Sequence, residues 1–269
     1  MIQNSKSSYE IRSAIIEKIW HGRDPFLGFP KNHYFIDVQG WNSDHPYLIE
    51  AIEGMKPRII VEIGVWKGGS TMTMAKKIKE LNLDCVVISV DTWLGSSEHW
   101  LNQEWFNDIS IVNGYPNLFY KFMANIINLE LQNYVLPLPI DSINAAKIFK
   151  NNNIEIDVLH LDAGHDYNSV FGDLGAWWPL LRAGGVLIGD DYAPDGGWPE
   201  VRQAFDDFFG ARGLIPFEHG GNKCRIQKLS PLPEDFDPAR YLDLNPDIRV
   251  TDPGRHWQEF GCREGRRWK

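Results

Sequence analysis

The stretch Arg58-Ile-Ile-Val-Glu-Ile-Gly-Val-Trp-Lys-Gly-Gly-Ser70 decides the fold class of this chain. Its first six residues form a largely β-branched run, which is typical of a strand buried on both faces of a parallel sheet. Gly64 and Gly68 then allow a tight turn and a close approach of the backbone to a ligand. A helix is predicted from this turn to about Leu81, and its N-terminus offers free N–H groups to a carboxylate or a phosphate.

Further strands and helices alternate on either side of this segment. Besides 58–63, strands are predicted at 85–90, 134–138, 157–161, 186–189, 214–217 and 224–228. The other predicted helices are 1–24, 46–53, 116–129, 142–150, 166–181 and 199–211. We expect Ser142 to cap the helix at 142–150, and Gly184-Gly185 to end the helix at 166–181. This alternation predicts an α/β fold, with a doubly wound (Rossmann-like), seven-stranded, mostly parallel sheet that carries helices on both faces.

Segments outside the sheet divide the chain into three parts. Residues 1–57 are the predicted N-terminal helical and lid segment, and 58–229 are the main domain. Residues 230–269 form a small C-terminal helical appendage that begins with the linker Ser-Pro-Leu-Pro. Within the main domain, residues 92–115 are aromatic and polar, and we expect them to form a lid with short helices.

Composition narrows the function. The formal net charge of −9 over 269 residues argues against a nucleic-acid partner, because phosphate binding needs clustered Lys and Arg. Cys85, Cys224 and Cys262 are odd in number and far apart, so we expect no disulfide framework and a reducing, cytoplasmic location. No apolar run reaches the roughly 18–20 residues of a membrane span, and the polar N-terminus lacks a signal-peptide core.

The glycine turn and the acid after the second strand point to a nucleoside ligand. The spacing of Gly64 and Gly68 differs from the dinucleotide-binding G-x-G-x-x-G, and the Lys-Ser/Thr pair of a P-loop is missing. Asp91 closes the second strand, where a carboxylate can accept hydrogen bonds from both hydroxyls of a ribose. The alternatives are a turn that any doubly wound protein needs, and a turn or capping role for Asp91.

The segments VEIGVWKGGST and ISVDTW resemble the first two motifs of class I methyltransferases that use S-adenosylmethionine (SAM). The likeness spans about residues 58–230. In that family the glycine loop holds the methionine part of SAM and the acid after the second strand binds the ribose. The cofactor-binding residues that the resemblance implies are Glu62, Gly64, Gly68 and Ser70 for the methionine part, Asp91 for the ribose, and Asp141 and Ser142 near the adenine.

Two predicted strand ends carry an unusual density of acids. The fourth strand ends in Leu-His-Leu-Asp162-Ala-Gly-His165-Asp166, and the fifth ends in Ile-Gly-Asp190-Asp191. Adjacent parallel strands lie about 4.8 Å apart, so Asp162, Asp190 and Asp191 should converge if these two strands are neighbours. Crowded carboxylates repel unless a cation or a shared proton joins them, and oxygen ligands suit a hard ion such as Mg²⁺. The alternative is that some of these acids cap helices and face solvent.

His165 lies on the loop that leaves the fourth strand. Methylation of a sugar hydroxyl requires removal of its proton, because the pKa of such a hydroxyl lies far above neutrality. A metal ion can lower that pKa, and a neutral imidazole can take the proton. We therefore expect His165 to be the base. The alternative is that His165 packs against or caps the start of the next helix. Glu98 and His99 could reach the same place from the lid.

The motifs Asp162-Ala-Gly-His165 and Asp190-Asp191 are similar to those of the metal-dependent sugar O-methyltransferases of macrolide tailoring, the macrocin and mycinamicin type. This likeness implies that Asp162, Asp190 and Asp191 hold the metal and that His165, Asp162 and Asp191 carry the catalysis. Relatives with similar motifs act as hydroxylases of antibiotic cores. A hydroxylase of the same fold acting on a small natural product is therefore an alternative reaction.

Residues 236–269, with the segments FDPARYLDLNPDI and HWQEFGCREGRRW, resemble a short module found beside glycosyltransferases and other surface-polysaccharide enzymes. The resemblance favours a sugar or glycan acceptor in bacterial surface-polysaccharide biosynthesis and a glycosyltransferase partner. The alternatives are a docking element on the main domain, a contact with a glycan or anionic lipid, and a non-catalytic scaffold. Aromatic residues in the first 45 positions point to a homo-oligomer.

Overall fold

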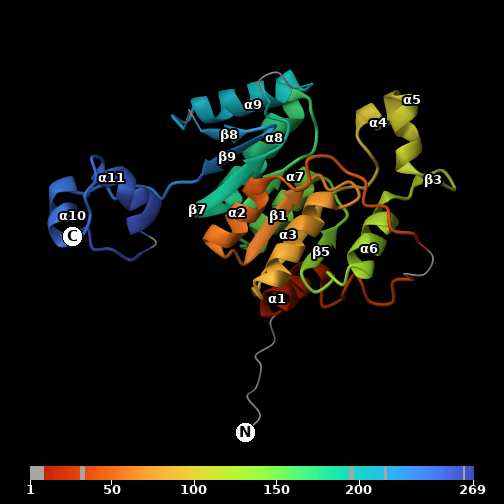
Figure 1. Cartoon of the computed structure of the whole chain (residues 1–269), viewed down its shortest axis with the longest axis horizontal. Coiled ribbons are helices and arrows are strands. Elements are labelled where there is room, and N and C mark those ends of the chain that lie inside the picture. Colours follow the sequence, from red (N-terminus) through yellow and green to blue (C-terminus); the bar gives the residue numbers. More distant parts are fainter. Residues whose placement is uncertain (1–8, 31–33, 194–196, 215–216, 263) are drawn as a thin grey trace, which may run out of the picture.

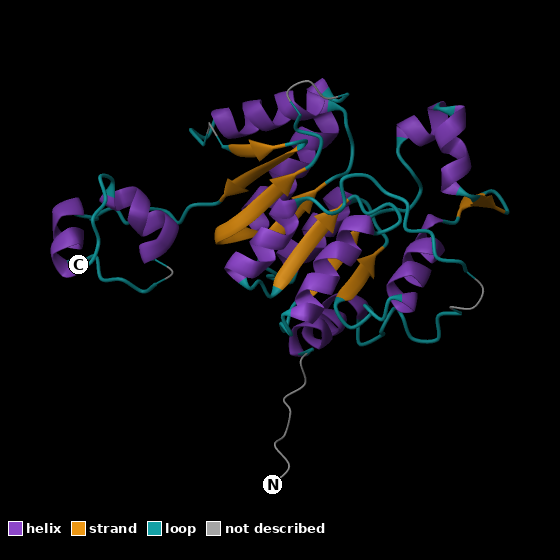
Figure 2. Ribbon diagram, in the orientation of Figure 1, coloured by secondary structure: helices purple, strands orange, loops and turns teal. Residues whose placement is uncertain are grey.

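A computed structural model describes residues 9–30, 34–193, 197–214, 217–262 and 264–269 of the chain. Figures 1 and 2 show a central twisted sheet between two layers of helices. The strand order is β5 (Val135–Leu138), β2 (Val86–Val90), β1 (Ile59–Ile63), β6 (Ile156–Leu161), β7 (Leu181–Gly189), β9 (Lys223–Gln227) and β8 (Glu218–Gly220). The first five strands in this order are parallel, and β9 and β8 are antiparallel to their neighbours. The predicted seven-stranded, mostly parallel sheet is confirmed.

Successive side chains of β1 enter two separate apolar cores, because side chains alternate between the faces of a strand. Val61 and Ile63 lie in one core and Ile60 lies in the other. The first core is covered by α1 (Glu10–Trp20), α7 (Ser142–Asn151), α8 (Tyr167–Trp177) and α9 (Pro199–Gly210). The second is covered by α2 (Pro46–Met55), α3 (Gly69–Glu80) and α6 (Leu118–Asn128). Each fully buried side chain of these cores contributes about 1.5–3 kcal/mol relative to an exposed one.

Two predicted boundaries were wrong. The glycine pair Gly184-Gly185 does not end a helix but lies inside β7, where Gly184 N–H donates to the carbonyl of Lys228. The helix ends earlier, at Trp177, and a short 3₁₀ turn, η3 (Trp178–Leu180), follows because Pro179 has no N–H to continue it. The sixth strand was predicted at 214–217, of which 215–216 lie outside the described residues, and the structure places it at 218–220 instead.

The predicted lid consists of short elements that stand beside the sheet (Figure 1). They are α4 (Ser97–Leu101), α5 (Gln103–Phe106), η2 (Asn107–Ile109) and a hairpin of β3 (Ile111–Val112) and β4 (Tyr115–Pro116). The C-terminal residues form α10 (Pro238–Leu244), α11 (Pro253–His256) and η4 (Trp257–Gly261), which lie apart from the sheet at the end of an extended connection. Among the described residues, no helix is long and apolar enough to cross a bilayer.

The turn after β1 depends on glycine at position 64. Its φ is 81°, and a Cβ there would lie 1.9 Å from the carbonyl oxygen of Asp162, which follows the neighbouring strand. We therefore expect Gly64→Ala to lower the free energy of unfolding by about 3 kcal/mol or more, as measured by urea denaturation. Gly172→Ala is the matched control, because Gly172 lies in α8 with open space around it and should change stability by less than about 1 kcal/mol. Equal effects of the two substitutions would contradict this account of the turn.

Candidate active site

The predicted site residues gather at the carboxyl edge of the sheet. β1 pairs with β2 on one side and with β6 on the other, so the order of the strands reverses beside β1. In sheets of this kind the ligand crevice lies outside the carboxyl ends of the strands at such a reversal. The predicted SAM residues follow β1, β2 and β5, and the acids follow β6 and β7, so both groups belong to this edge.

Asp91 ties the glycine turn to the end of β2. Its Oδ2 accepts from the backbone N–H of Val65 at 2.8 Å and of Trp66 at 3.0 Å, and its Oδ1 accepts from Trp93 N–H at 2.7 Å. Burial raises the pKa of this carboxyl, while the three N–H donors act in the opposite direction. Asp91 therefore shapes the turn in this structure, and its contact with a ribose stays a prediction.

Glu62 and Ser70 support the same turn from within the protein. Glu62 is fully buried and accepts hydrogen bonds from the hydroxyls of Ser70 and Thr71, the residues that start α3. Gly68 caps that helix with φ 90°, and a Cβ there would lie 2.7 Å from the ring of Phe122. These contacts hold the strand, the turn and the helix start together. The predicted contacts of Glu62, Gly64, Gly68 and Ser70 with the methionine part of SAM stay predictions.

Asp141 and Ser142 follow β5 and begin α7. The sequence pointed to Ser142 as the cap of this helix, but the cap is Asp141, whose Oδ1 accepts from Asn144 N–H at 3.0 Å. The hydroxyl of Ser142 is used elsewhere: it donates to Asp173 of α8 and accepts from Trp177 Nε1 at 2.8 Å. Their position after β5 is the one predicted, and a contact with adenine stays a prediction for both.

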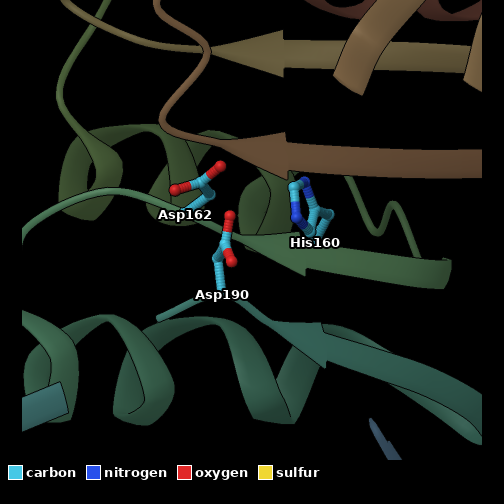
Figure 3. A group of neighbouring side chains, drawn as sticks. All are labelled: His160, Asp162 and Asp190. Carbon is cyan, nitrogen blue, oxygen red and sulfur yellow. The ribbon is translucent and has the colours of Figure 1, made fainter. Parts of the chain in front are cut away.

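The acids after β6 and β7 form a close pair because these strands are parallel neighbours, in register from Val158↔Val186 to Leu161↔Gly189. Asp162 and Asp190 point toward each other at the strand ends, with His160 beside them (Figure 3). Burial and the carboxylate of Asp190 raise the pKa of Asp162 well above its ordinary value. The predicted convergence therefore holds for this pair.

A buried lysine compensates part of this charge. Lys223, at the start of β9, is fully buried, and its Nζ lies 2.5 Å from Asp190 Oδ2. Burial alone would raise the pKa of Asp190, but the ammonium of Lys223 brings it below its ordinary value. The other oxygen of Asp190 accepts from Asn222 Nδ2 at 2.6 Å and from Asp191 N–H at 2.9 Å. Asp190 therefore stays ionised, and hydrogen-bond donors contact both of its oxygens.

The ammonium of Lys223 also decides which ring nitrogen of His160 carries the proton. Lys223 Nζ lies 3.2 Å from His160 Nε2, and an ammonium can only donate, so Nε2 must be an unprotonated acceptor. The ring proton then lies on Nδ1, which is 3.1 Å from Glu62 Oε1 and donates to it. His160 is therefore a neutral link between Glu62 and Lys223.

His165 and Asp191 form a second pair at the same edge. His165 Nε2 lies 3.1 Å from Asp191 Oδ2, and the ring stacks on Trp198 with centroids 4.1 Å apart. Asp191 takes φ 55°, which directs it differently from Asp190. From the lid, Glu98 Oε1 comes within 3.9 Å of His165 Nδ1. His165 Nδ1 and Glu98 Oε2 are buried atoms without a hydrogen-bond partner among the described residues, so both remain available to a ligand with hydrogen-bond donors.

The donor set fits a divalent cation in part. His160, Asp162 and Asp190 present ligand atoms within 4.8 Å of one another, but both nitrogens of His160 are engaged as described above. The carboxylates remain, and oxygen donors suit Mg²⁺. Among the described contacts, Asp162 has no lysine partner, unlike Asp190. Asp191, the next residue after Asp190, supplies a further carboxylate. Metal binding by Asp162, Asp190 and Asp191 stays a prediction.

Lys223 and Asn222 were not predicted as part of the site. Asn222 precedes β9 and Lys223 begins it, and nothing in the residues around them signals a contact with Asp190. Only the antiparallel pairing of β9 with β7, which sets Cys224 opposite Gly189, brings them to the end of β7. Patterns over a few neighbouring residues do not predict that pairing.

Comparison with known proteins agrees with this arrangement. Residues 61–192 match a family model described as a methyltransferase domain. The solved structure of the O-methyltransferase NovP is similar, with a TM-score of 0.51 and 22% identity, over 68% of this chain and 76% of that one. CalS11, a calicheamicin methyltransferase, gives a TM-score of 0.50 and 17% identity over the same shares. An uncharacterized protein of Sinorhizobium fredii, y4gI, is 23% identical over 161 residues, which are 59% of this chain but 16% of that protein.

The matched residues run from β1 to the acids after β7, so the matched region includes both halves of the predicted site. The two solved structures share its fold. Together the family match and the fold support the predicted enzyme class, a SAM-dependent methyltransferase. The chain spans 16% of the length of the Sinorhizobium relative.

The carboxyl of Asp173, to which Ser142 donates, predicts a pH dependence of stability. Burial raises its pKa from 3.8 to about 6. A carboxyl with a raised pKa in the folded state favours its neutral form, so its contribution is present below about pH 4 and is lost as the pH rises through about 6. We expect Asp173→Asn to be more stable than the wild type at pH 8 by about 1–3 kcal/mol and to lack this decline, as measured by urea denaturation at several pH values.

The control for this prediction is Asp166→Asn at the N-terminus of the same helix. Hydrogen bonds from Ser169 lower the pKa of Asp166, so its contribution is lost when the pH falls rather than when it rises. A decline between pH 4 and 8 that is the same in Asp173→Asn and in the wild type would show that Asp173 does not cause it.

Proposed function

We propose that this chain transfers the methyl group of SAM to a sugar hydroxyl, with help from Mg²⁺, in the biosynthesis of a bacterial surface polysaccharide or glycan. The observation that carries the proposal is the pair of His165 and Asp191, 3.1 Å apart, next to the acids Asp162 and Asp190 and at the same sheet edge as the glycine turn. The O-methyltransferase NovP shares the fold, which supports an oxygen acceptor. The similarity to the macrocin and mycinamicin type supports a sugar.

The contacts of His165 assign its two nitrogens. The carboxylate of Asp191 only accepts, so the ring proton lies on Nε2 and Nδ1 carries the lone pair. Nδ1 is buried and unpartnered among the described residues, and it faces the lid at Glu98. We place the acceptor hydroxyl there, so that its proton passes to Nδ1 and Asp191 stabilises the imidazolium that forms.

We propose that methyl transfer then takes place in a single step. SAM supplies an electrophilic methyl group on a sulfonium. The hydroxyl oxygen forms the new C–O bond as the C–S bond breaks, and the products are the methyl ether and S-adenosylhomocysteine (SAH). The chain orients the acceptor and accepts its proton, and positioning of this kind supplies a large share of the rate. A divalent cation held by Asp162, Asp190 and Asp191 would lower the pKa of a hydroxyl that binds it.

The outer parts of the chain belong to the proposal as well. We propose that residues 1–57 form an N-terminal helical and lid segment and that residues 58–229 form the methyltransferase domain. Residues 230–269 form a module of polysaccharide enzymes. Two cations near the end of this module are paired with acids: Arg266 with Asp247 at 2.8 Å and Lys269 with Asp235 at 2.7 Å. Residues 230–269 contain seven Lys and Arg against eight Asp and Glu, so the module carries no net positive charge, which favours a glycan or protein partner over anionic lipid. A glycosyltransferase partner and a homo-oligomer stay predictions.

Replacing the proposed base tests the role assignment. We expect His165→Ala and Asp191→Asn to bind SAM as the wild type does in calorimetric titration and to lose about 100-fold or more in single-turnover rate with nucleotide sugars or oligosaccharides as acceptors. Asn tolerates the left-handed backbone of position 191, so this variant keeps the local fold. His21→Asn is the control, because His21 is an exposed residue at the end of α1 that also takes a left-handed backbone. Normal turnover in both variants, or a product heavier by one oxygen atom instead of one CH₂ group, would refute the assignment.

Removal of divalent cations tests the metal. We expect a chelator to abolish turnover and added Mg²⁺ to restore it, while SAM affinity stays unchanged because the predicted metal ligands, Asp162, Asp190 and Asp191, are not among the residues predicted to hold SAM. Asp162→Asn should require a higher Mg²⁺ concentration for half-maximal rate. Undiminished turnover in the chelator would remove Mg²⁺ from the proposal and leave methyl transfer by His165 standing.

A further inference from the structure

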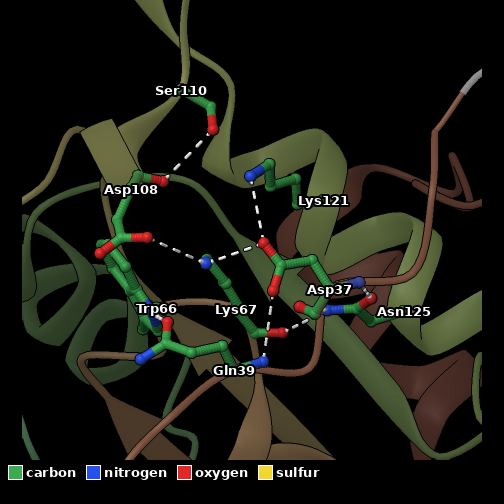
Figure 4. Close-up of polar contacts among 8 residues, drawn as sticks. All are labelled: Asp37, Gln39, Trp66, Lys67, Asp108, Ser110, Lys121 and Asn125. Carbon is green, nitrogen blue, oxygen red and sulfur yellow. Dashed lines mark hydrogen bonds and ion pairs between the residues drawn. The ribbon is translucent and has the colours of Figure 1, made fainter. Parts of the chain in front are cut away.

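Lys67 lies within the glycine turn, yet its side chain serves two other parts of the chain. The side chain is only 2% exposed, and its Nζ lies 2.8 Å from Asp37 Oδ2 and 3.8 Å from Asp108 Oδ1 (Figure 4). Asp37 belongs to the segment before α2, and Asp108 belongs to η2 of the lid. One ammonium therefore joins the cofactor turn to segments about thirty residues before it and forty residues after it.

The segment that contains Asp37 runs along the whole turn, and we call residues 37–43 the strap. Asp37 meets Lys67 at one end of the strap. Further along, Gln39 Oε1 accepts from Trp66 Nε1 at 3.0 Å. At the other end Ser43 lies so close to Gly69 that a Cβ on this glycine would be 2.8 Å from the Cβ of Ser43. The strap thus contacts the turn at three successive points.

Asn125 of α6 anchors the start of the strap to the same place. Its Oδ1 accepts from Asp37 N–H at 2.9 Å, and its Nδ2 donates to the carbonyls of Asp37 at 2.7 Å and of Lys67 at 2.8 Å. Lys121, also on α6, lies 3.1 Å from Asp37 Oδ2. Asp37 is therefore held from two sides, whereas the lid reaches this cluster through the contact of Asp108 with Lys67.

The charge of Lys67 makes these contacts interdependent. An ammonium this deeply buried is costly unless carboxylates compensate it, and here one carboxylate comes from the strap and one from the lid. Displacement of either segment removes part of that compensation. The strap and the lid are consequently most stable when both lie against the turn.

We infer that Lys67 is a positioning residue for cofactor binding, which holds the strap (37–43) and the lid (92–115) closed over the glycine turn so that the methionine part of SAM or SAH leaves only when this contact opens. The inference rests on the proposed function, because it takes the glycine turn as the SAM site. It assigns Lys67 no contact with the reacting atoms.

Hydrogen exchange of the ligand-free protein tests the structural part. In Lys67→Met we expect amide exchange to accelerate about tenfold or more both in the strap, where the N–H groups of Asp37 and Gln39 are hydrogen-bonded, and in residues 103–112 of the lid. Lys77→Met is the matched control, because Lys77 of α3 also pairs with two carboxylates, Glu53 and Glu80, each at 3.0 Å. Unchanged exchange in either segment of Lys67→Met would overturn the inference.

Asp108→Asn provides a second variant that removes only the lid contact, at a carboxylate whose side chain is 43% exposed and whose loss the fold should tolerate. Exchange should accelerate in the lid of this variant and stay slow in the strap. Acceleration in neither segment would overturn the inference even if Lys67→Met failed to fold.

The dissociation rate of SAH separates this inference from the proposed function. We expect SAH to leave Lys67→Met about tenfold faster than wild type, with Lys67→Arg restoring much of the difference and Lys77→Met showing none. Equal rates in Lys67→Met and wild type would overturn the inference and leave the methyltransferase proposal intact. Failure of the wild type to bind SAH would refute the proposed function, while the exchange experiment would still decide whether Lys67 closes the two segments.

Discussion

The buried ammonium of Lys223 is the interaction on which the functional edge depends. It is fully enclosed and lies 2.5 Å from Asp190 and 3.2 Å from His160. A charge in such a place is tolerated only with close partners, and these come from β6 and from the end of β7. The register of β6, β7 and β9 is therefore constrained by charge as well as by apolar packing. A shift of β9 along β7 would leave Lys223 and Asp190 unpaired at once.

This interaction also connects the two halves of the site. Glu62 holds the start of α3 through Ser70 and Thr71, and through His160 it reaches Lys223 and then Asp190. The cofactor turn and the acid pair are the two ends of one buried polar chain, which runs through β1, β6 and β9 and ends at Asp190 after β7. Residues linked in this way respond jointly to substitution, because each orients the next. Lys67 is a second enclosed ammonium, and it gathers acids from two separate segments, Asp37 of the strap and Asp108 of the lid.

Prediction from the sequence succeeded where the signal was local. The run before Gly64, the glycine turn and the acids at the strand ends were all found at their observed places, because strand alternation and turn chemistry act over a few residues. It failed at Gly184-Gly185, which resemble a helix end. In the structure these glycines belong to β7, because they exchange backbone hydrogen bonds with Lys228, which follows β9. It also failed at Ser142, where Asp141 one residue earlier competes for the same capping position and the serine hydroxyl is drawn to α8 instead.

The sequence by itself determined that buried strands alternate with covering helices, and hence that Asp162 and Asp190 each follow a buried strand. These properties follow from periodicity along the chain. The tertiary structure decided that these two strands are neighbours. It alone also decided which cation lies beside Asp190, that Asp191 turns toward His165, and that Lys67 joins the strap to the lid. Those contacts join residues 26 to 41 positions apart, and they arise only when packing brings the segments together, because no short-range pattern records which distant side chain will compensate a buried charge.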